Sequence, residues 1–314
     1  MSKKLWQPSL IVKKNSNLFA FENYISKKLK IKFNRNYKKL LNWSIKNSPE
    51  FWSRFWDFSK IKGIKSNKNF RKSKTFYKNL FLPGSRLNFG ENLLSKNNNE
   101  KAVTFISENG FREERSWRQL NLNTNKISKF LKKINIKKGD RVAAYMPNTI
   151  ETVEAFIATT SLGGIWSSCS PDFGSKGVIE RFSQINPKVL FITDQYFYNG
   201  KKIDILNRLP EILKLIPSIK SVVISNYPGK KFIKNKYKFK KINLFKWNEL
   251  MQTNAEKIDF KRFDFETELA ILYSSGTTGK PKCICHRSGG VLIQHMKEHQ
   301  LHCNIKENDN VFYF

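Results

Sequence analysis

Residues 139–193 read GDRVAAYMPNTIETVEAFIATTSLGGIWSSCSPDFGSKGVIERFSQINPKVLFIT, and this stretch decides the fold class. Three short apolar runs in it predict buried strands, at residues 141–146, 165–169 and 189–193. The two segments between them have the length and apolar spacing of helices, at about residues 151–162 and 176–185. Strands that alternate with helices in this way predict a layered α/β domain with a mostly parallel sheet.

The same alternation extends to both sides of this stretch. Residues 102–106 are expected to form a strand. Ser116 is expected to cap a helix that ends at about Lys133, because a serine hydroxyl can accept a hydrogen bond from the first helical turn. Further strands are predicted at residues 221–225 and 269–272. We therefore expect one α/β domain over residues 96–314.

Residues 1–95 have a different texture and predict a mainly helical region. Residues 18–47 carry apolar side chains at helical spacing between lysines. Ser48 as N-cap and Pro49 as first helical residue are expected to begin another helix, whose aromatic face at residues 51–58 packs inward. Residues 63–78 are polar, basic and aperiodic, which favours a linker or a surface loop.

The chain of 314 residues carries 58 Lys and Arg against 25 Asp and Glu, a formal net charge of +33. A polyanion partner such as nucleic acid or a membrane surface would explain this excess, and so would lysines that fill solvated positions. The excess is densest in residues 1–95, with 22 basic against four acidic residues, yet it continues without one dense block. Lysine also outnumbers arginine, which is better suited to bidentate phosphate or base recognition. We therefore expect solvated surface charge and no specific nucleic acid partner.

The cysteine content indicates a reducing compartment. Four cysteines are present, and none forms a CxxC pair: Cys169, Cys283, Cys285 and Cys303. In a chain of this size they do not suggest a disulfide scaffold, so a cytoplasmic location is expected. No apolar run is long enough to predict a signal peptide or a membrane span. The sequence does not predict the oligomeric state.

The segment Leu272–Lys282 reads LYSSGTTGKPK and follows an apolar run. Its glycines allow backbone N–H groups to turn towards an anion, and its hydroxyls add donors without bulk. A lysine at the end offsets phosphate charge, so the segment is suited to hold a triphosphate. It is not a Walker P-loop, GxxxxGK[ST]: the first glycine would fall on Ser274, and Pro281 stands where that motif has its Mg²⁺-binding hydroxyl.

Two other patterns suggest metal or thiol chemistry but do not predict it. Residues 295–299 read HMKEH and match the zinc-peptidase pattern HxxEH. A zinc site would need a third ligand, and no acidic helix follows in this sequence. Cys283, Cys285 and His286 follow the Leu272–Lys282 segment, and alternation along a strand explains them. We expect no metal site built from the chain's own residues.

The segment Leu272–Lys282 resembles the phosphate-binding signature of the adenylate-forming superfamily, which includes acyl-CoA synthetases, luciferases and peptide-synthetase adenylation domains. Other segments resemble the acetoacetyl-CoA synthetases within it: LPGSRLNFGENLL at 82–94, DRVAAYMPN at 140–148, WSSCSPDFG at 166–174, and residues 286–302. The resemblance implies the layered α/β sheets of the large N-terminal domain of these enzymes, incomplete here. The helical region 1–95 resembles the cap region that precedes this domain.

The resemblance implies an acid–CoA ligase, with ATP, Mg²⁺ and CoA as cosubstrates and acetoacetate as the acid. Acetate or propionate is the alternative acid, and a basic nucleic-acid-binding protein is the alternative class. The residues expected to contact the ATP phosphates are Ser274, Ser275, Gly276, Thr277, Thr278, Gly279, Lys280 and Lys282. Lys282 is expected to be the main charge-stabilising cation, because it ends the family signature.

Two further expectations rest on the same resemblance. Asn199, Gly200 and Lys201 align loosely with a segment that contacts a CoA phosphate in acetyl-CoA synthetases. Family members continue for about as many residues again beyond the equivalent of Phe314, where this chain looks like a strand. The chain is therefore expected to be an N-terminal fragment that lacks the lid domain and is inactive alone.

Overall fold

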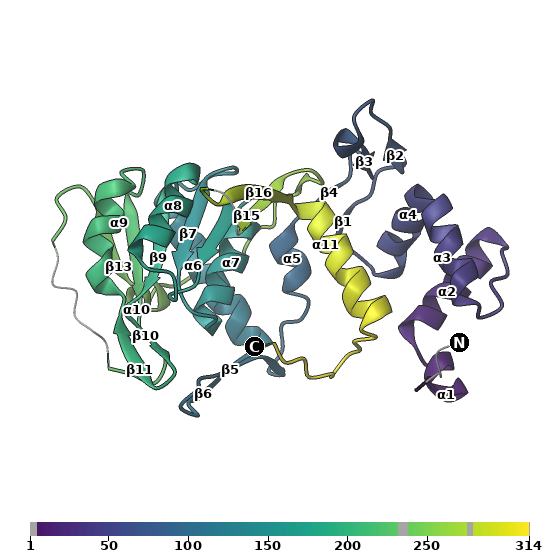
Figure 1. Ribbon diagram of the computed structural model, residues 1–314, viewed down its shortest axis with the longest axis horizontal. Coiled ribbons are helices and arrows are strands. Elements are labelled where there is room, and N and C mark those ends of the chain that lie inside the picture. Colours follow the sequence, from purple (N-terminus) through teal and green to yellow (C-terminus); the bar gives the residue numbers. More distant parts are fainter. Residues whose placement is uncertain (1–4, 232–237, 275–278, 314) are drawn as a thin grey trace. The chain divides into compact units, whose positions relative to one another are not determined.

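A computed structural model describes residues 5–231, 238–274 and 279–313 (Figure 1). The chain forms two compact units. Residues 88–288 form the α/β unit, and residues 1–87 together with 289–314 form the helical unit.

The α/β unit is built on a seven-stranded sheet with the order β13-β12-β9-β7-β8-β15-β16. Its strands are β7 (Arg141–Tyr145), β8 (Ile165–Cys169), β9 (Val189–Thr193), β12 (Ser221–Ser225), β13 (Asn243–Lys246), β15 (Glu268–Ser274) and β16 (Lys282–Arg287). All described neighbours pair in parallel except β15 and β16, which pair antiparallel at one edge. The central strands are nearly continuous apolar runs because both faces of the parallel part are covered.

Helices cover both faces of this sheet. On one face, α8 (Ser175–Ile185) and α9 (Leu209–Leu215) share a buried core with side chains of β7, β9 and β12. On the other face lie α6 (Trp117–Lys133), α7 (Ile150–Ser161) and α10 (Trp247–Met251). Their aromatic rings meet rings of the sheet edge-on, at centroid distances of 4.8 Å for Phe130–Phe245, 5.8 Å for Phe156–Trp166 and 6.1 Å for Trp247–Phe191. The predicted α/β layering is confirmed, and the elements of the central stretch lie within one residue of their predicted bounds.

Two hairpins and several short elements complete the α/β unit. The hairpins are β5 (Lys101–Ile106) with β6 (Arg112–Ser116), and β10 (Gln195–Tyr198) with β11 (Lys201–Asp204). The short elements are α5 (Phe89–Leu93), the 3₁₀ turn η2 (Leu206–Arg208) and β14 (Phe263–Asp264). Ser116 caps α6 as predicted: its hydroxyl accepts from the Gln119 N–H at 3.2 Å, and the Gln119 side chain accepts from the Ser116 N–H at 2.8 Å.

The helical unit differs from the prediction in its first half. The expected helix over 18–47 is two helices, α2 (Asn17–Leu29) and α3 (Tyr37–Lys46), after the short α1 (Leu10–Lys14). The chain leaves helical geometry at Lys30, whose φ of 56° is left-handed, and Asn36 caps α3 through the Lys39 N–H at 3.1 Å. Apolar spacing continued across the break, but local backbone conformation and an asparagine cap divide the helix there.

Helix α4 (Ser48–Phe58) carries the aromatic face predicted for it. The Phe21 ring of α2 lies edge-on to Phe51, Phe55 and Phe58, at centroid distances of 5.6, 5.6 and 5.0 Å. The predicted start was wrong by one residue: Asn47 is the N-cap, without a side-chain cap bond, so Ser48 and Pro49 are the first two helical residues.

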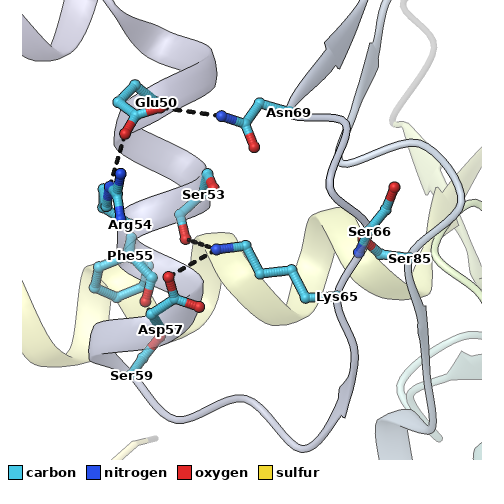
Figure 2. Close-up of polar contacts among 10 residues, drawn as sticks. All are labelled: Glu50, Ser53, Arg54, Phe55, Asp57, Ser59, Lys65, Ser66, Asn69 and Ser85. Carbon is cyan, nitrogen blue, oxygen red and sulfur yellow. Dashed lines mark hydrogen bonds and ion pairs between the residues drawn. The ribbon is translucent and has the colours of Figure 1, made fainter.

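The segment after α4 is more ordered than the predicted linker or loop. It contains β1 (Gly63–Ile64), β2 (Phe70–Arg71), η1 (Phe76–Lys78), β3 (Leu80–Phe81) and β4 (Arg86–Leu87). Figure 2 shows how polar contacts anchor it to α4: Lys65 Nζ binds Asp57 at 2.7 Å and the Ser53 carbonyl at 2.8 Å, and Asn69 donates to Glu50 at 3.0 Å. These contacts order a polar segment whose sequence shows no periodic pattern.

The end of the chain also belongs to the helical unit. Helix α11 (Ser288–Lys297) continues into the π-helix η3 (Glu298–His302), and Asn17 of α2 then binds Asn304 at 2.8 Å and Ile305 at 3.0 Å. The strand expected near the end was wrong for the residues that the structure describes, since 311–313 lie outside any strand and are exposed. Phe314 lies outside the described residues. No helix in the described ranges has the length and apolar character of a membrane span.

Candidate active site

The sheet brings two segments singled out from the sequence to the same edge. Strands β8 and β15 are parallel neighbours, with Trp166 opposite Ala270. Ser170 is the first residue after β8, and Ser274 is the last residue of β15. Because the two strands run parallel, the segments that follow them leave the sheet at the same end. Ligands of parallel α/β sheets bind outside the carboxyl ends of the strands, so this edge is the candidate site.

The predicted phosphate loop connects β15, which ends at Ser274, with β16, which begins at Lys282. Ser275, Gly276, Thr277 and Thr278 lie outside the described residues. Gly279 has a φ of +115°, a conformation that favours glycine, and open space surrounds the position of an added Cβ. Lys280 and Lys282 are exposed, and neither forms an ion pair with a described residue. Both cations are thus available to an anionic ligand.

Side chains of β8 and α8 bind the residues that precede and follow the predicted loop. The Ser167 hydroxyl donates to the Ile271 carbonyl at 2.9 Å and contacts the Tyr273 hydroxyl at 3.0 Å. Burial raises the pKa of Tyr273, so its hydroxyl stays protonated. On the other side, the Gln184 side chain of α8 donates to the Pro281 carbonyl at 2.9 Å. The described residues on either side of the loop are therefore held by the central sheet and by α8.

The neighbouring turn, Ser170–Gly174, contains the Ser-Pro-Asp-Phe-Gly string. The Ser170 hydroxyl donates to Asp172 at 2.5 Å, which closes the turn on itself. From below, Arg208 Nη1 donates to the carbonyls of Pro171 at 3.0 Å and Phe173 at 2.8 Å. The guanidinium of Arg181 lies 4.1 Å from the centroid of the Phe173 ring. Two arginines of η2 and α8 therefore hold this turn.

The candidate CoA segment has a local structural explanation. Asn199 and Gly200 form the two-residue turn of the β10–β11 hairpin, with φ values of 49° and 71°, as expected for an Asn-Gly turn. Their N–H groups both donate to the Glu108 carboxylate, at 2.8 and 3.0 Å. Lys201 is exposed. The described contacts of this turn run to Glu108 and not to the phosphate loop, so its role towards CoA stays a prediction.

The two metal-like patterns do not assemble a site in the described part of the chain. No group of three or more His, Cys, Asp or Glu side chains there has the geometry to hold a metal ion. His295 and His299 have ring centroids 6.3 Å apart on α11 and η3. Cys283 and Cys285 are exposed on the edge strand β16, and burial raises the pKa of both thiols.

Sequence reasoning did not assign a role to four residues that hold the site: Ser167, Arg181, Gln184 and Arg208. Ser167 lies in the quoted segment 166–174, but only its contact with Ile271 shows what it does. Gln184 and Arg208 belong to no quoted motif and bind partners far away in the sequence, Pro281 and Pro171. The packing of α8 and η2 against the sheet brings Arg181, Gln184 and Arg208 to this edge.

The parallel α/β sheet and the candidate site at the carboxyl ends of its strands are typical of nucleotide-binding α/β proteins. Comparison with known proteins identifies the family. The chain belongs to the AMP-binding enzyme family, whose model matches residues 92–314. Within that family, it is homologous along its whole length to acetoacetyl-CoA synthetases, which confirms the resemblance of its motifs.

The similarity is consistent in sequence and in structure. The chain is 37% identical to the acetoacetyl-CoA synthetase of Xenopus tropicalis, over 100% of this chain and 47% of that protein. It is 36% identical to the acetoacetyl-coenzyme A synthetase of Rhizobium meliloti (strain 1021), over 99% of this chain and 47% of that protein. Its fold matches acetoacetyl-CoA synthetase from Streptomyces lividans with a TM-score of 0.88 and 28% identity, covering 97% of this chain and 46% of that one. The chain thus spans about half the length of the curated relatives it matches.

Proposed function

We propose that this chain is part of an ATP-dependent acid–CoA ligase, and that acetoacetate is its acid. The observation that carries the proposal is the similarity to acetoacetyl-CoA synthetases along the entire chain. The framed phosphate loop at the carboxyl edge of the sheet supports it, because that edge is where α/β proteins bind nucleotides. Within this protein, residues 1–95 are the cap region and residues 96–314 belong to the adenylation domain.

The reaction has two steps. An oxygen of the acid carboxylate attacks the α-phosphorus of ATP, and the bond to the bridging oxygen of pyrophosphate breaks. The sulfur of CoA then attacks the acyl carbon, AMP leaves with the bonding pair, and the thiol proton passes to solvent or a base. Both steps depend on positioning and on stabilising negative charge in the transition state.

The phosphate loop would supply much of this stabilisation. Hydroxyls and N–H groups of Ser274–Gly279 contact the phosphates, Lys282 is the principal cation, and Lys280 is secondary. ATP would enter as its Mg²⁺ complex. The segment Asn199–Lys201 is the weaker candidate for a CoA phosphate, because Glu108 already holds its two turn N–H groups. A cytoplasmic location fits the free cysteines of the described chain.

A product assay on the complete protein tests this function. Acetoacetate, acetate and propionate are each supplied with ATP, Mg²⁺ and CoA, and thioester, AMP and ADP are quantified. We expect AMP, pyrophosphate and thioester, with the highest kcat/KM for acetoacetate. Formation of ADP would contradict an adenylate intermediate, and a clear preference for acetate or propionate would reassign the acid.

The net charge of +33 keeps a basic nucleic-acid-binding protein as the alternative class. An electrophoretic shift assay across salt concentrations separates the two. A protein that binds nucleic acid specifically shows affinity that falls steeply with salt but is still measurable at moderate salt. Solvated surface charge gives no measurable affinity for nucleic acid at moderate salt.

A further inference from the structure

The Ser170–Gly174 turn begins directly after β8, and the predicted phosphate loop begins directly after β15. The two strands are parallel neighbours that pair at Trp166 and Ala270, so both segments leave the sheet at its carboxyl end. With the phosphates held by the loop, as proposed above, we expect the segment after the neighbouring strand to border the reacting end of the nucleotide. The shape of this turn therefore affects the geometry at that end.

The backbone of the turn is held from below by two side chains acting together. Tyr145, the last residue of β7, is fully buried, and its hydroxyl donates to the Phe173 carbonyl while accepting a hydrogen bond from Arg208. Arg208 also donates to the Pro171 and Phe173 carbonyls. One guanidinium and one phenol thus fix two carbonyls of a five-residue turn.

The acceptors of Arg208 are all neutral. No carboxylate forms an ion pair with it among the described residues, although it is half-buried. Hydrogen bonds from a charged donor are stronger than those between neutral groups, so the arrangement strongly favours this one backbone shape. Fixing the two carbonyls inward leaves the Phe173 ring on the outside of the turn, 38% exposed and stacked on Arg181.

We infer that Arg208, acting with Tyr145, is a positioning residue that holds the Ser170–Gly174 turn against the reacting end of the bound nucleotide. This rests on the proposed ligase function. Arg208 touches no substrate. It acts through the turn, so its loss impairs the chemical steps more than it impairs ATP binding.

The test uses Arg208→Met, Arg208→Lys and Tyr145→Phe in the complete protein, with Lys214→Met on the exposed side of α9 as control. Steady-state kinetics give kcat and the KM for ATP. A second readout does not depend on activity: the rate at which a thiol reagent labels the Cys169 peptide, followed by mass spectrometry. Cys169 directly precedes the turn and is buried, and burial raises its pKa to about 12, so it should label slowly.

For Arg208→Met we expect kcat to fall at least tenfold, because misplacing a positioned group has a cost of about this size. The KM for ATP should change less than about threefold. Cys169 should be labelled at least tenfold faster. Arg208→Lys should restore part of kcat. Adding Tyr145→Phe to Arg208→Met should cost little more, because both hold the same carbonyl. Wild-type kcat and labelling in Arg208→Met, or lost activity with slow labelling, would overturn the inference. If the wild-type protein forms no thioester, the proposed function fails, and the labelling rates still report whether Arg208 holds the turn.

Discussion

Arg208 and Arg115 both bind close to the β7–α7 connection, but their partners differ in charge. Arg208 donates to two carbonyls and a phenol next to the end of β7. Arg115 of β6 lies among three carboxylates, with Glu113 at 2.6 Å, Glu154 at 3.4 Å and Glu151 at 3.8 Å. An arginine with neutral acceptors fixes a backbone shape, whereas an arginine among buried acids offsets charge that the fold has enclosed.

The acidic cluster around Arg115, formed by Glu113, Glu151 and Glu154, encloses carboxylates whose desolvation destabilises the fold. The candidate site has no such buried acids among its described contacts. The Glu154 side chain is fully buried, and desolvation raises its pKa to about 8, although the Asn123 side chain donates to it at 2.8 Å. One carboxylate oxygen each of Glu151 and Glu154 has no hydrogen-bond partner in the described part of the chain. The comparison predicts that substitutions at the loop change catalysis and leave stability alone, while substitutions in the cluster do the reverse.

The largest effect is expected at the phosphate loop. Lys282→Ala or Thr278→Ala in the complete protein should lower the rate of acid-dependent pyrophosphate exchange by a factor on the order of 10²–10³, as the loss of one charge-stabilising donor does. Lys280→Ala is the matched control and should lose less. Melting temperatures of the Lys282→Ala and Lys280→Ala proteins should stay within about 2 °C of wild type, because both lysines are exposed without ion pairs to described residues. Unchanged exchange in both Lys282→Ala and Thr278→Ala would remove these residues from the site.

Removal of Arg115 should destabilise the fold with little effect on turnover per folded molecule. Arg115→Met leaves Glu113, Glu151 and Glu154 without their cation, and breaking such a buried network costs about 3 kcal/mol. Arg112→Met on the same strand is the control. Its partner Glu114 and Arg112 itself are both more than one-third exposed, so Arg112→Met should change the free energy of unfolding little. Urea unfolding monitored by circular dichroism measures the loss of stability in each variant. Equal urea midpoints for Arg115→Met and Arg112→Met would show that the acidic cluster does not contribute to stability.

Glu154 should make stability depend on pH in a defined direction. Its folded-state pKa of about 8 lies above the ordinary value of 4.5, so the folded state holds a proton that the unfolded chain releases. The contribution is complete below pH 4.5 and is lost as pH rises to about 8. Glu154→Gln removes this dependence. It should match wild type near pH 4.5 and be more stable by about 2 kcal/mol near pH 8, after allowance for relaxation of the cluster. Denaturant midpoints at several pH values test this, and parallel curves for the two proteins would contradict it.

These predictions differ in how much of their basis the sequence could supply. The phosphate loop is a local string, so its residues were predicted from composition and resemblance alone, and the strands of residues 139–193 were predicted from their apolar runs. The Arg208–Tyr145 contact joins residues 63 apart, and Asn123 reaches Glu154 across 31 residues. Nothing local marks either pair, since an arginine in a leucine-rich segment or a glutamate in a helix is usually solvated. The break at Lys30 was missed for a related reason: the apolar spacing runs through it, and only the left-handed backbone there ends α2.

The smallest effect tests whether the cap beside Arg115 belongs to the cluster. Ser116 follows Arg115 directly and forms a reciprocal pair of hydrogen bonds with Gln119 at the start of α6. Ser116→Ala should cost about 1 kcal/mol, because it leaves an N–H of the first turn without an acceptor, and Ser116→Thr should cost less. If the cap and the cluster act independently, the loss will be the same at pH 5 and pH 8, since no titrating group contacts the Ser116 hydroxyl among its described bonds. The measurement is the difference in urea midpoint between Ser116→Ala and wild type at both pH values. A loss that is larger at pH 8, where Glu154 begins to ionise and needs its cation, would mean that the cap positions Arg115 over Glu154, and the cluster would then extend into the first turn of α6.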